Sequence, residues 1–184
     1  MKNYKQIISS LKLPLLVALG VGSLIALNAC SSRKSNTEVV SNFDIKQYKG
    51  EWYEIARFDF KHEKNMSHVT ANYSLNEDGS VKVINKGYDY IKKEWKTSEG
   101  KAKFNGDSNK GALKVSFFGP FYAEYNVVMM DPNYENALVF GENTDYIWIL
   151  SRNKTISESV KKKFTDYAKA NGYPLEKLVW TKQD

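Results

Sequence analysis

The stretch that decides the fold is residues 50–57, Gly-Glu-Trp-Tyr-Glu-Ile-Ala-Arg. Successive side chains in such a run fall alternately on the two faces of an extended strand. Residues 69–75 follow the same rule, because Val69, Ala71 and Tyr73 alternate with polar neighbours. The turn sequence Asn-Glu-Asp-Gly comes directly afterwards. Short alternating runs next to turns of this kind are typical of β-strands.

After these two predicted strands, the chain continues as short extended runs near residues 81–85, 95–104, 111–118, 123–130, 136–142 and 145–151. Gly, Asn, Asp and Pro fill the gaps, which indicates an antiparallel meander with tight turns. An open sheet of eight strands would leave two unprotected edges, and closing it into a barrel removes them. Eight strands enclose an interior wide enough for one small ligand. We therefore predict an all-β fold, an eight-stranded antiparallel up-and-down barrel.

One helix follows the strands. Its apolar residues recur at helical spacing, at Ile156, Val160, Phe164, Tyr167 and Ala168. Thr155 and Glu158 predict a capping box at its start, and Gly172 predicts its end. A single apolar stripe suits a helix that packs on the outside of the barrel wall. A short ninth strand is expected over residues 177–181.

Three short motifs resemble those of one family, in its order and spacing. Residues 50–57 resemble its Gly-x-Trp-Tyr motif on the first strand, and residues 131–139 its motif between the sixth and seventh strands. Residues 148–152, Trp-Ile-Leu-Ser-Arg, resemble the motif that ends the eighth strand. Over residues 42–182 the chain resembles the lipocalin family, and within it the bacterial outer-membrane lipoproteins and apolipoprotein D. The resemblance implies a lipocalin barrel domain over residues 42–184.

The motif residues are interpreted as structural rather than ligand-binding. A tryptophan at the entry to the first strand fills the closed end of a barrel, and the resemblance implies that Arg152 lies across the Trp52 indole. Arginine over an indole face gains about 1–2 kcal/mol when it is desolvated. Gly50, Trp52, Tyr53 and Arg152 are therefore expected to close one end of the barrel.

Ligand contacts are expected from the inward side of each strand. Alternation along the strands groups these positions, and the likeness to apolipoprotein D supports five of them as cavity-facing. The predicted cavity residues are Tyr73, Val83, Asn85, Phe117, Tyr125, Val127, Trp148 and Leu150. They describe apolar walls with a few polar groups, which is the usual chemistry of small-molecule sites. The alternative, that some of them only pack the core, stays open.

An acyl-chain ligand suits such a cavity. Each buried methylene contributes ~0.8 kcal/mol, so ten of them reach micromolar-scale binding before ordering costs. Fatty acids or lysophospholipids are the expected ligands, with a charged headgroup near lysines or arginines at the open mouth. The resemblance implies lipid storage or transport for envelope maintenance, including under stress.

The first 29 residues predict a lipoprotein signal peptide. Three lysines precede an uncharged, mostly apolar run over residues 13–27, and Ala29 stands directly before Cys30. A basic start, a short apolar stretch and a small residue at the cut are typical of a secretory signal. The run is shorter than the ~18 residues that indicate a membrane-spanning helix.

Cys30 is the single cysteine of the 184 residues. It either becomes the lipidated N-terminus, as in the bacterial lipoproteins that the signal resembles, or is a small apolar residue of the signal. Several acyl chains would anchor the protein stably. The resemblance to these lipoproteins also implies the outer membrane, because residue 31 is Ser rather than aspartate, and the periplasmic face is expected. Residues 30–41 are polar and predict the lipidated N-terminus with a flexible tether.

Charge and residue types argue against other classes of protein. Removing residues 1–29 lowers the formal net charge from +6 to +3, because three lysines and no acidic residue are lost. The lysines at 161–163 lie on the predicted helix and suit a solvated face, so no nucleic-acid partner is expected. Whether the domain forms a homodimer stays open.

An enzyme, a haem or pigment carrier and a structural envelope protein are the alternatives. The only histidines are His62 and His68, and no zinc-type spacing or nucleophile elbow is present in the sequence. Prostaglandin synthesis by a lipocalin uses a cavity cysteine, whereas Cys30 is the predicted anchor. We expect no catalytic residues, no metal and no cofactor.

Overall fold

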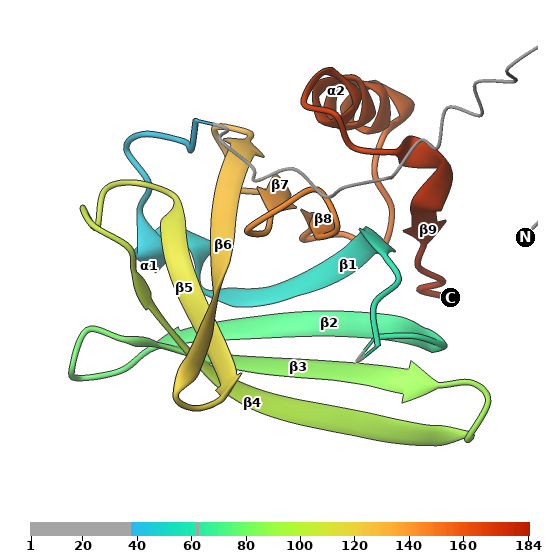
Figure 1. The fold of residues 1–184 in the computed structure, drawn as a ribbon, viewed down its shortest axis with the longest axis horizontal. Coiled ribbons are helices and arrows are strands. Elements are labelled where there is room, and N and C mark those ends of the chain that lie inside the picture. Colours follow the sequence, from blue (N-terminus) through green and yellow to red (C-terminus); the bar gives the residue numbers. More distant parts are fainter. Residues whose placement is uncertain (1–37, 62) are drawn as a thin grey trace, which may run out of the picture. The chain divides into compact units, whose positions relative to one another are not determined.

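The computed structural model describes residues 38–61 and 63–184 (Figure 1). Eight strands follow one another: β1 (Gly50–Phe58), β2 (Met66–Leu75), β3 (Val81–Asp89), β4 (Glu94–Phe104), β5 (Ala112–Phe118), β6 (Phe121–Met130), β7 (Asn136–Phe140) and β8 (Ile147–Ser151). Each pairs antiparallel with the next, and β1 also pairs with β8, which closes the sheet. The predicted eight-stranded antiparallel barrel is confirmed.

The expected signal peptide (residues 1–29) and Cys30 lie outside the described residues. Val40, which belongs to the predicted tether of residues 30–41, bonds to the barrel: its amide donates to the Val127 carbonyl at 2.9 Å, and its carbonyl accepts from the Gly111 amide. The Val40 side chain packs against the barrel interior, which its apolar character favours. The described residues belong to one compact unit. Both buried clusters of the barrel are built from residues 40 onward.

The longest helix of the described residues, α2 (Glu158–Ala170), packs outside the barrel (Figure 1). Phe164 and Ala168 join a buried cluster with outward residues of the wall such as Leu138 and Ile149. The predicted capping box was wrong, because Ser157 is the N-cap and its hydroxyl accepts from the Val160 amide. The short 3-10 helix η1 (Leu175–Lys177) leads to the expected ninth strand, β9 (Leu178–Trp180), which pairs with β1. No described helix is long and apolar enough to cross a membrane.

A four-residue helix that the sequence did not predict, α1 (Ile45–Tyr48), precedes β1. Asp44 caps it by accepting from the Lys46 amide at 2.9 Å. The helix is too short to show helical periodicity, and its one buried residue, Tyr48, is in the interior cluster. It covers the end of the barrel at which β1 begins, here called the closed end (Figure 1).

Two β-bulges change which side chains face inward. The bulge between Glu54 and Ala56 in β1 brings Arg57 to the side of Glu54, although strict alternation predicts opposite sides. The bulge between Val127 and Met129 in β6 leaves Met129 against the helix-side cluster, although alternation groups it with Val127. An extra residue in one strand reverses the alternation beyond it.

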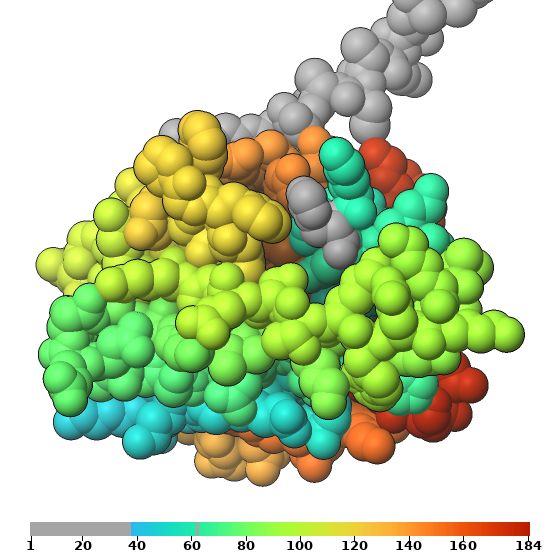
Figure 2. Space-filling view, turned by 90° about the horizontal axis from the view of Figure 1, so that it is seen from below, coloured from blue at the N-terminus to red at the C-terminus, as the bar shows by residue number. Residues whose placement is uncertain are grey.

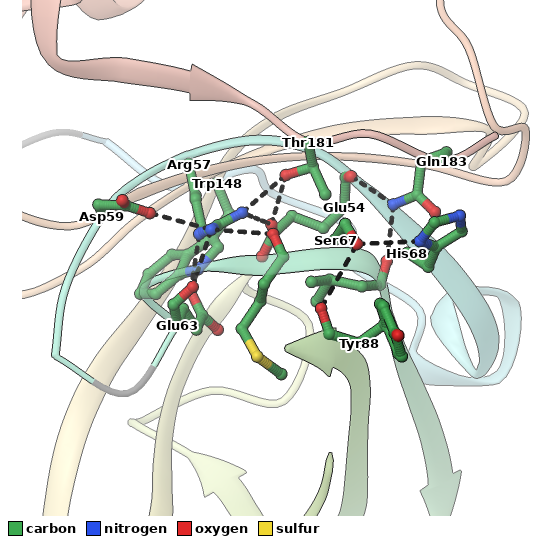
Figure 3. A network of polar contacts seen from close by, with 12 residues as sticks. Glu54, Arg57, Asp59, Glu63, Ser67, His68, Tyr88, Trp148, Thr181 and Gln183 are labelled. Atoms are coloured by element: carbon green, nitrogen blue, oxygen red, sulfur yellow. Dashed lines mark hydrogen bonds and ion pairs between the residues drawn. The ribbon is translucent and has the colours of Figure 1, made fainter. Parts of the chain in front are cut away.

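The C-terminal segment fills a gap between β1 and β2. These strands pair only from Gly50 to Tyr53. Beyond that point the Gln183 side-chain amide donates to the Glu54 and Val69 carbonyls at 2.8 and 2.9 Å (Figure 3). The Lys182 carbonyl accepts from the His68 amide at 2.7 Å. The segment therefore satisfies backbone groups that the separated strands leave without ladder partners.

Candidate ligand cavity

The barrel encloses a cavity of about 780 Å³. Its opening lies at the end away from α1, here called the mouth, and Figure 2 shows the surface hollowed beside the hairpin that joins β5 and β6. Seven of the eight predicted residues line it: Tyr73, Val83, Asn85, Phe117, Tyr125, Trp148 and Leu150. Its apolar walls are completed by Val69, Ala71, Leu113 and Val115. A volume of this size is within the range of small-molecule sites.

Val127 does not line the cavity, contrary to the prediction. It takes the inward side of β6 and is fully buried, but it packs in the interior cluster with Phe43 and Tyr48. Val127 also accepts from the Val40 amide through its carbonyl, which places it beside the segment that enters the closed end. Strand parity gives the side of the wall on which a residue lies, but not its depth along the barrel.

Three tyrosine hydroxyls meet on the wall of the cavity. The Tyr125 hydroxyl lies 2.7 Å from that of Tyr48 and 2.8 Å from that of Tyr73. Burial is the main cause that raises the pKa of each of these tyrosines, so all three stay neutral at physiological pH. The cluster is the polar part of an otherwise apolar inner wall. Tyr48, which belongs to α1, was not predicted as a cavity residue.

The closed end is sealed by Trp52 and Arg152. The guanidinium carbon of Arg152 lies 4.0 Å from the centre of the Trp52 ring. Its nitrogens donate to five main-chain carbonyls, those of Gln47, Tyr48, Lys49, Glu51 and Tyr134. One side chain thus joins α1, the start of β1 and the turn before β7. Gly50 has φ +98, a conformation that favours glycine, and an added Cβ would lie 3.4 Å from Arg152.

A group of buried charges that the sequence did not predict lies near the mouth (Figure 3). Arg57 is 1% exposed and donates to Glu54 at 2.7 Å, to Asp59 at 2.9 Å and to the Glu63 carbonyl at 2.8 Å. Thr181 donates to the same Glu54 oxygen at 2.6 Å. Glu54 and Glu63 also line the cavity. A charge that is buried in this way is stable only when its partners remain in place.

The pKa values of both glutamates are raised. Burial is the largest cause for Glu63, followed by the charge of Glu54, and together they raise its pKa to about 8. Burial also raises the pKa of Glu54, although Arg57 and Thr181 oppose the shift. Because Glu54 holds the closer contact with Arg57, Glu54 is the ionised member at neutral pH. Glu63 then carries the proton, and its Oε2 accepts from the Trp148 indole at 3.1 Å.

Glu63→Gln should therefore raise the free energy of unfolding at alkaline pH. Between its ordinary pKa of 4.5 and its folded-state pKa of about 8, the folded chain binds more protons than the unfolded chain. The contribution of the Glu63 proton to stability is thus fully present below pH 4.5 and is lost as the pH rises through 8. Above that pH the variant should be more stable by about 1–2 kcal/mol, which is less than the full shift implies at ~1.4 kcal/mol per unit. The Glu63 side chain is 15% exposed, so solvent screens part of the penalty.

Urea unfolding of both proteins at acidic and alkaline pH measures this difference. The same substitution at exposed Glu77, in the turn between β2 and β3, serves as the control and should change stability little at any pH. A Glu63→Gln variant whose advantage is the same at both ends of the pH range would contradict the assignment of the proton to Glu63.

The position of one member of this charged group could have been predicted from the sequence. Glu54 stands two residues after Trp52, so alternation already places its carboxylate on the inward face of β1. Arg57 joins it only through the bulge, and Glu63 belongs to the loop between β1 and β2, where no periodicity applies. Among the described residues, no group of three or more His, Cys, Asp or Glu side chains could hold a metal ion.

Comparison with known proteins identifies the family. A family model described as "Lipocalin-like domain" matches residues 43–183. The chain is 47% identical over 171 residues to "Outer membrane lipoprotein Blc" of Citrobacter freundii, covering 93% of this chain and 97% of the relative. It is 35% identical to mouse "Apolipoprotein D" over 155 residues, or 79% of each chain.

Among solved structures, the cockroach allergen Per a 4 superposes with a TM-score of 0.63 at 19% identity, over 80% of this chain and 92% of the allergen. This likeness shows the fold, and the sequence matches show the family. Lipocalins bind small hydrophobic ligands, and the cavity described above has the walls for one. The chain belongs to the lipocalin family, within its group of outer-membrane lipoproteins.

Proposed function

We propose that this lipocalin binds one acyl-chain lipid, a fatty acid or a lysophospholipid, and stores or carries it for maintenance of the cell envelope. The observation that carries the proposal is the cavity of about 780 Å³, which has apolar walls and opens at the mouth. Apolar wall residues such as Val83, Leu113 and Leu150 are contributed by strands from around the barrel. An acyl chain that fills this space gains ~0.8 kcal/mol for each methylene removed from water.

The headgroup is expected at the mouth. Lys61, Lys86 and Lys96 line that part of the cavity, and so do Glu124 and Glu142. A phosphate or carboxylate would meet the lysines there. The charged side chains deeper in the wall are already bonded to one another, as Arg57 is to Glu54. Their proposed role is to hold the wall of the cavity in place, and no catalytic role is proposed for them.

The proposal includes an anchor at Cys30 and removal of residues 1–29. Since residues 38–184 number 147, at least 24 of the 171 residues matched to the Citrobacter freundii lipoprotein precede residue 38. The likeness thus extends into the part of the chain that carries the predicted signal and Cys30. We propose that acylated Cys30 holds the domain at the periplasmic face of the outer membrane.

Filling the cavity should weaken lipid binding strongly. Ala71 lines the cavity on β2, whereas its neighbour Asn72 is exposed on the other face of the same strand. Ala71→Trp should weaken the binding of palmitate or lysophosphatidylcholine by about a hundredfold, since the indole displaces several methylenes of ligand. Asn72→Trp adds the same side chain outside and should bind like the wild type.

Displacement of a fluorescent fatty acid measures both affinities, and far-ultraviolet circular dichroism verifies that each variant is folded. Equal affinities for the folded Ala71→Trp and Asn72→Trp proteins would place the ligand outside the barrel. Absence of binding by the wild type would overturn the proposed function itself.

A further inference from the structure

Large apolar side chains are exposed on the rim of the mouth. Phe121 is 79% exposed, Phe118 69% and Ile91 65%, which is far more than apolar residues on a wall usually show. They belong to two hairpin tips, residues 90–95 between β3 and β4 and residues 118–122 between β5 and β6, which together are called the mouth rim. The exposed large apolar side chains of the rim are Tyr90, Ile91, Trp95, Phe118, Phe121 and Tyr122.

Both tips lie at the mouth by topology. Met66, the first residue of β2, pairs with Asp89, the last residue of β3. The turn from β3 to β4 therefore lies at the mouth, where β2 begins. β5 runs from the closed end toward its last residue, Phe118, which pairs with Phe121 across the turn. Figure 2 shows both tips on one face of the molecule, the first in light green and the second in yellow, with the hollow beside the yellow tip. Apolar groups gathered around an opening indicate an interaction site, whereas single exposed ones do not.

One of the two tips carries a net positive charge. Residues 118–122 carry no charge. Residues 90–96 carry three lysines and one glutamate, a net charge of +2, with Lys92 and Lys93 at the tip itself. Lys96 is bound to Asp89 at 2.6 Å and lies 4.0 Å from Glu94. The acidic groups that also face the mouth are Asp59, Glu63, Glu124, Glu142 and Asp145.

Two lysines lie over aromatic rings of the rim. The Lys103 ammonium is 4.4 Å from the centre of the Tyr122 ring, and the Lys86 ammonium is 4.7 Å from that of Trp95. Aromatic rings with apolar bodies and lysines that keep their charged end in water are the side chains found where proteins meet the headgroup region of a bilayer. Anionic headgroups would complement the positive tip at Lys92 and Lys93.

We propose that the mouth rim docks on an anionic phospholipid surface, with the two apolar tips entering the headgroup region and the lysines contacting lipid phosphates. The mouth would then face the surface from which a lipid ligand is taken or to which it is delivered. This goes beyond lipid binding in the cavity, because a domain that takes its ligand from solution needs no such rim.

The proposed anchor permits this orientation. Val40 bonds to the barrel at the closed end. If the mouth faces the membrane that holds the Cys30 acyl groups, the ten residues from Cys30 to Val40 must span the height of the barrel. Ten residues reach at most about 35 Å. The nine residues of β1 extend about 30 Å at ~3.3 Å per residue, and tilt shortens their span. An extended tether is long enough.

A fluorescent label tests the docking in the chain that begins at Ser31, which has no cysteine. Gly119→Cys labelled with a nitrobenzoxadiazole group reports on the rim, because an added side chain at Gly119 meets no atom within 4 Å. Glu77→Cys carries the same label on an exposed turn at the closed end. Both are mixed with vesicles of phosphatidylcholine, with and without phosphatidylglycerol.

We expect the label at residue 119 to brighten and shift to the blue with phosphatidylglycerol vesicles, and the label at residue 77 to stay unchanged. Lys92→Glu combined with Lys93→Glu should weaken partitioning by about tenfold or more, and added salt should weaken it as well. Phe121→Ser should also reduce partitioning, whereas Leu75→Ser, at the other end of the barrel, should not.

An equal response of the two labels, equal binding to both kinds of vesicle, or no binding would each overturn the proposal. Lipid binding in the cavity is measured separately with Ala71→Trp, so the two proposals can fail independently.

Discussion

Arg57→Leu should lower the free energy of unfolding by about 3–5 kcal/mol, the usual result of removing one partner of a buried ion pair. The guanidinium is 1% exposed and is the only cation in contact with Glu54 among the described residues. Its loss leaves the Glu54 carboxylate buried beside Thr181 without a counter-charge. It also removes the bonds to the Glu63 and Met66 carbonyls that hold the loop between β1 and β2.

The loss should depend on pH in a defined direction. Without Arg57, burial holds the folded-state pKa of Glu54 still further above its ordinary value. The variant is therefore destabilised most at alkaline pH and recovers as the pH falls and Glu54 is protonated. Urea denaturation at two pH values measures both effects. Lys61→Leu, which removes an exposed cation from the same loop, should change stability by less than ~0.5 kcal/mol. A pH-independent loss in Arg57→Leu would argue against the charge assignment.

Arg152→Ala should lower the free energy of unfolding by about 2–4 kcal/mol, or the melting temperature by roughly 10 °C. The substitution removes hydrogen bonds to five carbonyls and the contact with the Trp52 ring. Hydrogen bonds from a charged donor are worth more than neutral ones, and cation–π stacking adds about 1–2 kcal/mol when it is desolvated. Because Arg152 does not line the cavity, lipid affinity per folded molecule should remain nearly unchanged.

Thermal melts and fatty-acid titrations on the same samples separate these two effects. Lys154→Ala, two residues along and exposed, is the matched control and should leave both quantities unaltered. A selective loss of affinity in Arg152→Ala, without a loss of stability, would mean that the motif residues belong to the ligand site after all.

Periodicity predicted the wall of the barrel and left its ends undetermined. Alternation assigned the cavity side of Tyr73, Asn85 and Leu150 because these residues lie in regular stretches of β2, β3 and β8. It failed at Met129 because a bulge inserts one extra residue and reverses the faces beyond it. Nothing in residues 127–129 distinguishes a bulge from regular strand, since the choice depends on pairing with β7.

The charged group near the mouth depends on tertiary structure in the same way. Arg57 contacts Thr181, which is 124 positions away in the sequence, and Glu63 on a loop. Contacts of such long range leave no local pattern in a single sequence. Helix α1 was missed because four residues cannot show helical periodicity. The N-cap of α2 was assigned to Thr155 instead of Ser157 because the hydroxyls of both residue types can accept from a helix N-terminus.

Native mass spectrometry of the full-length protein, extracted with detergent from its own cell envelope, tests the central claim most directly. The account predicts one lipid of acyl-chain mass retained per molecule of wild-type protein beyond any acyl groups on Cys30. The same lipid should be present in Asn72→Trp and absent from Ala71→Trp. A wild-type protein that carries no lipid, or an Ala71→Trp protein that carries as much as the wild type, would contradict a lipid-binding cavity inside the barrel.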